Sequence, residues 1–199
     1  IMSEFFEKNA VLYNNMFTET SYGNNTAISN FSYNGSAGNP VFYSDSDIQS
    51  EIKEYRDEKI ARLVNEISIL IQHDEFLDGE ISQSEMFMEE AYSNNDMEYV
   101  IEALMRLYYA NLLNVHVLEG ILVMIASVPY ESVEPKGQIM AMGLLTNKEL
   151  IIRDRAIQCF ERWNSKKGLI ALKSLDCHPK WLQNYVNKVI MYIERDGMD

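Results

Sequence analysis

The chain has little of what marks secreted, disulfide-bonded or membrane-spanning proteins. Cys159 and Cys177 are its only cysteines, so no disulfide framework is possible and we expect a reducing, cytoplasmic setting with both thiols buried. The longest apolar run, GILVMIASVPY, falls well short of the roughly 20 residues that cross a bilayer. The first residues contain no cationic segment followed by an apolar one. Neither secretion nor membrane insertion is therefore expected.

Recognisable catalytic constellations are also missing. The sequence has three histidines, His73, His116 and His178, and none belongs to a metal-binding pattern. His116 and Glu119 are spaced to share a metal, but no second pair completes a carboxylate-bridged site. No phosphate-binding loop, dinucleotide-binding glycine motif or serine-hydrolase elbow occurs. We therefore expect no catalytic residues, no metal, no cofactor and no enzymatic activity.

Proline and glycine are scarce, at 4 and 9 residues, and fall mainly between stretches of helical apolar periodicity. From Ile48 onward no segment alternates for long enough to predict a strand, so the body is expected to be all-α. An apolar stripe runs through Ile48, Ile52, Tyr55, Leu63, Ile67 and Leu70. Further helix starts are expected at or just after Ser82 (with Glu85 in a capping box), Asn95, Asn114, Ser132 (with Pro135 in the first turn), Asn147, Ser165 and Pro179, the last helix ending before Gly197.

The stretch IRDRAIQCF, from Ile152 to Phe160, resembles the second helix of a HEAT repeat. Ile152 and Phe160 take the large apolar positions, Ala156 and Cys159 the small ones, and Arg153 the family's arginine. The segment LQNYVNKVI repeats the phrase imperfectly thirty residues later. The resemblance covers residues 132–197 and implies a right-handed stack of antiparallel helix pairs, with Arg153 in a structural role. In that stack the core is expected to include Ile152, Ala156, Phe160, Leu182, Tyr185 and Val189.

The composition divides the chain into an N-terminal part, residues 1–47, and a helical-repeat body, residues 48–199. Within the first part, residues 22–47 form a polar, non-helical arm rich in Asn, Ser and Gly and interrupted by four aromatic rings. Composition alone favours a flexible tail, whereas the aromatic spacing suggests docking on the body or on another chain. The body divides again into acidic first helices, residues 48–100, and HEAT-like pairs, residues 101–199.

Charge is segregated along the chain, whose net charge is −13. Residues 45–100 carry sixteen acids and four bases, a net of −12, whereas residues 101–199 carry eleven acids and twelve bases, a net of +1. A block of this kind attracts cationic partners, although acidic surfaces also serve solubility alone. We expect a basic protein partner, which makes the chain an immunity or inhibitor protein for a toxin or nuclease. The expected partner-binding residues are Asp74, Glu75, Asp78, Glu80, Glu85, Glu89 and Glu90.

Two other functions remain open. Arg155 and Arg162 lie seven residues apart on one helix face, outside the expected repeat core, and Lys166 and Lys167 follow in the next turn. This basic rim could contact nucleic acid, as in HEAT-like DNA glycosylases, although the pI of about 4.7 makes nucleic acid the less favoured partner. The rim could equally be an ordinary solvated face. The third possibility is a structural subunit that forms a homo-oligomer through the N-terminal arm.

Limited proteolysis of the free protein tests the arm. If Phe31, Tyr33, Phe42 and Tyr43 dock on an apolar groove of the body, residues 22–47 should be cleaved more slowly than an unfolded peptide, because burying these rings offsets the entropy lost on ordering. Immediate cleavage throughout the segment would leave docking on another molecule as the only form of the hypothesis.

Overall fold

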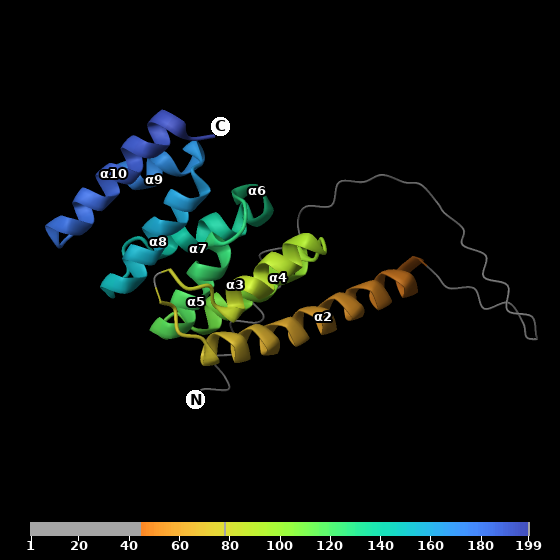
Figure 1. Cartoon of the computed structure of the whole chain (residues 1–199). Helices are drawn as coiled ribbons and strands as arrows, with labels where there is room; N and C mark the ends of the chain where they lie inside the picture. Colours follow the sequence, from red (N-terminus) through yellow and green to blue (C-terminus); the bar gives the residue numbers. More distant parts are fainter. Residues whose placement is uncertain (1–44, 78, 199) are drawn as a thin grey trace, which may run out of the picture. The chain divides into compact units, whose positions relative to one another are not determined.

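A computed structural model describes residues 45–77 and 79–198 (Figure 1). Within these residues the chain is helical, with no strand beyond an isolated bridge between Ser165 and Met198. The all-α prediction is therefore confirmed for this part of the chain. The helices are α2 (Asp45–His73), α3 (Gln83–Ser93), α4 (Met97–Ala110), α5 (Val115–Ala126), α6 (Tyr130–Val133), α7 (Lys136–Leu144), α8 (Leu150–Trp163), the 3₁₀ turn η1 (Lys166–Gly168), α9 (Leu169–Lys173) and α10 (Lys180–Asp196).

Local capping residues set several helix boundaries where the sequence predicts them. Ser82 and Glu85 form the expected capping box at the start of α3, each side chain accepting a backbone N–H from the other residue. The Asn114 side chain accepts the N–H of Val117 and begins α5. Gly197 ends α10. These boundaries follow the sequence because the groups that make them are neighbours along the chain.

The predicted helix near Ser132 is interrupted. The short helix α6 ends at Val133, and Glu134 has extended torsion angles of −70° and 148° before Pro135. A proline disfavours the helical conformation in the residue that precedes it, so the chain leaves the helix at Glu134 and starts α7 at Lys136. The expectation that Pro135 lies in the first turn of one continuous helix is wrong.

The helices pack in two rows that share a core. One row runs α3, α5, α8, α10, and the other runs α2, α4, α7, with α4 beside α5 and α7 beside α8 joining them (Figure 1). Helices α5 and α8 pack against each other, and both contribute fully buried apolar side chains, among them Ile121, Leu122, Ile125, Ile152 and Ala156. Cys159 and Trp163 of α8 donate hydrogen bonds to the Leu122 and Ile125 carbonyl oxygens of α5. This contact places α8 against α5 and so determines where the α8 arginines lie.

Five of the six predicted core residues of the last helices are buried: Ile152, Ala156, Phe160, Leu182 and Val189. Tyr185 is only partly buried, which corrects the prediction for that residue. Its hydroxyl donates a hydrogen bond to the carboxylate of Glu161. Burial, with Glu161 beside it, raises the pKa of the Tyr185 phenol, so the hydroxyl keeps its proton and remains the donor.

The helix α2 is longer than predicted, since it begins at Asp45 rather than at Ile48. Its expected apolar stripe is covered only in the second half of the helix, where Ile67 is buried. In the first half Ile48, Ile52 and Tyr55 are exposed, so the prediction of one continuous buried stripe is wrong there. The arm prediction falls almost entirely on residues 22–44, which lie outside the described residues, and it stays a prediction.

Phe160 offers a direct test of the α8 core. Its side chain is 2% exposed. The centroids of the Phe160 and Trp163 rings lie 5.6 Å apart in an edge-to-face arrangement, and the backbone of Gly168 packs directly on the Phe160 ring. We expect Phe160→Ala to lower the free energy of unfolding by about 3–5 kcal/mol, as truncation of a core aromatic does. Chemical denaturation measures this loss. Leu113→Ala is the control, because Leu113 is 89% exposed and should change stability by less than about 0.5 kcal/mol; a loss of only that size for Phe160→Ala would contradict the packing.

Candidate binding surface

Asp74, the first acid of the loop after α2, caps the next helix. Its carboxylate accepts the N–H of Gln83 at 3.2 Å and the N–H of Ser84 at 2.7 Å, and the residue is 9% exposed. The first turn of a helix has unpaired N–H groups and the positive end of the helix dipole, both of which favour a carboxylate. Asp74 therefore fixes the loop to α3, and its predicted place on the partner surface is wrong.

Glu85 is likewise internal. It is 8% exposed, and one carboxylate oxygen accepts the Ser82 N–H at 2.9 Å within the capping box. The other oxygen lies 3.3 Å from the Arg162 guanidinium. Both oxygens are thus used inside the fold. The expectation that Glu85 lies on a solvated helix face is wrong, and its substitution would disturb α3 as well as any binding.

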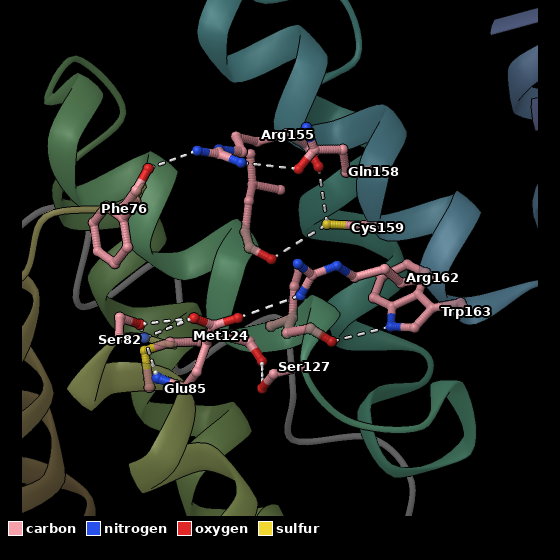
Figure 2. A network of polar contacts seen from close by, with 12 residues as sticks. Phe76, Ser82, Glu85, Met124, Ser127, Arg155, Gln158, Cys159, Arg162 and Trp163 are labelled. Carbon is pink, nitrogen blue, oxygen red and sulfur yellow. Dashed lines mark hydrogen bonds and ion pairs between the residues drawn. The ribbon is translucent and has the colours of Figure 1, made fainter. Parts of the chain in front are cut away.

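Arg155 connects three separate segments of the fold, as Figure 2 shows in part. From α8 its guanidinium donates to the Glu119 carboxylate of α5 at 3.1 Å and to the Phe76 carbonyl oxygen of the loop at 2.7 Å. A third donor contacts the Gln158 side chain at 3.0 Å. Because a buried guanidinium requires partners for its charge and its N–H groups, these contacts fix the loop against α5 and α8.

The structure changes the role expected for Arg155 and the kind of partner expected for Arg153. Arg155, predicted for the basic rim, is 9% exposed and forms the internal ion pair with Glu119. Arg153, predicted to be structural through acidic partners, is half-buried and donates to the His178 carbonyl oxygen at 2.8 Å. The physical reason is helical spacing: Arg155 lies three residues after the buried Ile152 and four before the buried Cys159, so it shares their face.

The remaining residues of the basic rim lie at the surface. Arg162 has a side chain that is 50% exposed and pairs with Glu85. Lys167 pairs with Glu134 at 2.7 Å, and that hydrogen bond raises the pKa of the lysine and lowers the pKa of the carboxyl. Lys166 is exposed beside it in η1. With Arg155 buried, the rim does not form one four-residue cationic patch.

A small cleft of about 40 Å³, partly open to solvent, lies where the loop meets α3, α5 and α8. Its walls include Glu85, Arg155 and Arg162 from the network of Figure 2, with apolar side chains of α5 between them. Its two arginines each face a carboxylate within the fold. The ionic groups of this cleft therefore hold the loop and the helices together.

Carboxylates that are exposed and unpaired gather instead on α2, the loop and α3. Glu75, Glu80, Glu89 and Glu90 are exposed, as predicted for partner-binding residues, whereas Asp78 lies outside the described residues. The glutamates of α2 were not among the predicted partner-binding residues. Their spacing of three, four and eight residues could have identified them, because it places them on one side of a helix. The acidic surface comprises eight exposed glutamates for which the described residues supply no ion-pair or side-chain hydrogen-bond partner: Glu51, Glu54, Glu58, Glu66, Glu75, Glu80, Glu89 and Glu90.

Most acidic side chains between residues 101 and 198 have an ion-pair or hydrogen-bond partner within the fold. Glu102 pairs with Lys136, Glu119 with Arg155, and Glu194 with Lys173. Most of the other acids between residues 101 and 198 also have a partner: Glu134, Glu149, Asp154, Glu161 and Asp196. The difference between the two halves of the body therefore lies in the pairing of carboxylates as well as in their number.

His116 and the two cysteines take part in packing, whereas His73 and His178 are exposed. The Nε2 atom of His116 lies 2.6 Å from the Ile71 carbonyl oxygen, and its ring lies 5.4 Å from that of Phe76. Cys159 and Cys177 are buried, and burial raises the pKa of both thiols. Across residues 45–77 and 79–198 no group of three or more His, Cys, Asp and Glu side chains is arranged to hold a metal ion. None of the helices described combines the length and apolar character needed to span a membrane.

Comparison of the chain with protein-family models, with curated proteins and with solved structures finds no match. Function must therefore be argued from the surface itself.

Arg155 gives the test of the internal network. Arg155→Ala leaves the Glu119 carboxylate, whose side chain is 15% exposed, without its cation, and we expect the free energy of unfolding to fall by about 3–5 kcal/mol. Arg162→Ala is the matched control and should cost at most about 1 kcal/mol, because its side chain is 50% exposed. The double variant Arg155→Met with Glu119→Gln should recover part of the loss. Equal costs for the two arginines in chemical denaturation would contradict the assignment.

Proposed function

We propose that this chain is a non-catalytic binding protein that captures a basic partner protein through the acidic surface. The observation that carries the proposal is the set of eight exposed, unpaired glutamates within residues 51–90, compared with the neutralised carboxylates of the later helices. If the acids served solubility alone, they would have no reason to gather on one half of the body.

The acidic surface would act mainly through long-range attraction. Lys53 and Arg62 are α2 cations that also lack an ion-pair partner among the described residues, so the surface keeps a clear excess of negative charge. Exposed ion pairs contribute less than about 1 kcal/mol each, whereas the summed field raises the rate of encounter with a cationic protein. Binding should therefore weaken steeply with salt, as the Debye length falls from about 10 Å at 0.1 M to about 3 Å at 1 M.

An immunity or inhibitor role in the cytoplasm, against a basic toxin or nuclease, is the form of this function that we favour. Such a role needs a stable body that presents charge, without a catalytic centre. The two rows of helices support a HEAT-like stack as the body, since successive helices pack on equivalent neighbours in such stacks. Nucleic-acid binding through the basic rim is less favoured, because Arg155 is buried in an ion pair with Glu119 and is not available to contact phosphates. No specific contact favours this alternative.

Affinity capture from the source cells tests the proposal. The wild-type chain and the variant Glu75→Gln, Glu80→Gln, Glu89→Gln, Glu90→Gln serve as paired baits in nuclease-treated lysate at low salt. We expect the wild type to retain a basic protein that 1 M salt releases and that the variant retains several-fold less well. The four side chains are exposed, so the variant should unfold at the same denaturant concentration as the wild type.

A bait with Glu131→Gln and Asp176→Asn is the control on the later helices. It removes two charges, compared with four in the quadruple variant, and should capture as well as the wild type. Equal capture by the quadruple variant would show that the acidic surface is a solubility device. Recovery of nucleic acid from untreated lysate, lost after nuclease, would favour the basic-rim alternative.

A further inference from the structure

The first half of α2 projects past the rest of the body. Every residue from 48 to 58 is exposed, a length of about 16 Å at 1.5 Å per residue. Among the side chains that the structure describes, ion pairs fasten α2 to α4 from Arg56 onward, through Arg56–Glu98, Asp57–Arg106 and Lys59–Asp96. In Figure 1 the orange end of α2 extends beyond α4. The exposed residues 48–58 are called the α2 overhang below; the ion pairs of Arg56 and Asp57 hold its C-terminal end to α4.

The α2 overhang carries an apolar stripe that the body does not cover. Ile48, Ile52 and Tyr55 are 44%, 55% and 58% exposed, and their spacing of four and three residues places them on one helix face. At 100° per residue this stripe lies about 100° around the helix from Ile60 and Ile67, which face the body. The stripe is therefore oriented away from the line along which α2 packs.

Acidic side chains border this stripe. Glu51, Glu54 and Glu58 share a second face, about 90° from the apolar stripe on the side opposite Ile60. All three are exposed and have no ion-pair partner among the described residues. The overhang thus presents apolar contact area and unpaired negative charge side by side, the arrangement by which one amphipathic helix recognises another.

We propose that the α2 overhang pairs with a basic amphipathic α-helix of the partner protein. The proposal rests on the proposed function and names the part of the partner that the surface recognises. Aliphatic side chains of that helix, spaced three and four residues apart, contact Ile48, Ile52 and Tyr55, and its flanking lysines or arginines face the three glutamates. A second copy of the chain is the poorer occupant, because each copy carries a net charge of −13 and the two repel.

A synthetic helical peptide provides the probe. It has leucines at three- and four-residue spacing and lysines along one flank, and fluorescence anisotropy measures its binding to the full chain. We expect Ile48→Ser, Ile52→Ser, Tyr55→Ser together to weaken binding about tenfold, the loss typical of removing central apolar contacts. The triple Glu51→Gln, Glu54→Gln, Glu58→Gln should also weaken it and flatten its salt dependence. A peptide with glutamate in place of lysine should bind far more weakly.

The matched control replaces three exposed apolar residues elsewhere, Ile81, Leu113 and Ile170, with serine. This variant should bind the peptide within about twofold of the wild type, because scattered exposed apolar residues do not form a docking site. If this control variant lost as much binding as the overhang variant, the proposal would be overturned, because the peptide would then bind exposed apolar side chains wherever they lie. Equal binding of the lysine and glutamate peptides would also overturn it.

The lysate capture separates this proposal from the proposed function. With the overhang apolar variant as bait, capture of the basic partner should fall sharply. Undiminished capture would overturn helix pairing while leaving the acidic-surface function in place, whereas failure of the wild type to capture a basic protein would overturn the function itself. Sedimentation velocity addresses self-association: a wild-type dimer that the apolar triple dissociates would assign the overhang to a second copy and overturn the proposal.

Discussion

The buried guanidinium of Arg155 is the contact on which the geometry of the acidic half depends. It joins α8 to Glu119 of α5 and to the Phe76 carbonyl oxygen of the loop. Once the loop is held there, the Asp74 carboxylate accepts the N–H groups of Gln83 and Ser84, which have no partner within the helix, and fixes the start of α3. The positions of Glu75, Glu80 and the α3 glutamates therefore follow from one internal cation. An arginine of residues 101–199, whose net charge is +1, thus positions carboxylates of the acidic residues 48–100.

Features determined by neighbouring residues could be predicted from the sequence. The capping box of Ser82 and Glu85, the Asn114 cap and the Gly197 stop are local in this sense, and all three were found. The break before Pro135 was equally local and could have been predicted from the restriction that proline places on Glu134. The resemblance of IRDRAIQCF to a HEAT helix implied that Ile152, Ala156 and Phe160 belong to the core, and all three are buried.

The placement of charge could not be predicted in the same way, since it depends on which distant groups meet. Asp74 and Glu85 look like members of an acidic cluster in the sequence, yet they bind backbone N–H groups and Arg162 inside the fold. Glu119 did carry a signal, as the one acid in the apolar helix α5, which suggests a buried partner. That partner, Arg155, lies 36 residues later and only the packing of α5 on α8 identifies it.

Most carboxylates of the later helices have partners within the described part of the fold, whereas those of the acidic surface do not. Glu102 and Glu119 in the later helices have cationic partners, so those acids contribute to the fold at little electrostatic cost. The eight glutamates of the acidic surface repel one another and oppose compaction, and the α2 overhang adds exposed apolar side chains to that cost. Departures from local consistency that serve no purpose in folding are expected at sites of function. The two departures coincide on α2, which carries Glu51, Glu54, Glu58 and Glu66 of the acidic surface beside its exposed apolar side chains. Its projecting half is therefore the place where charge attraction and apolar contact would act together on one partner.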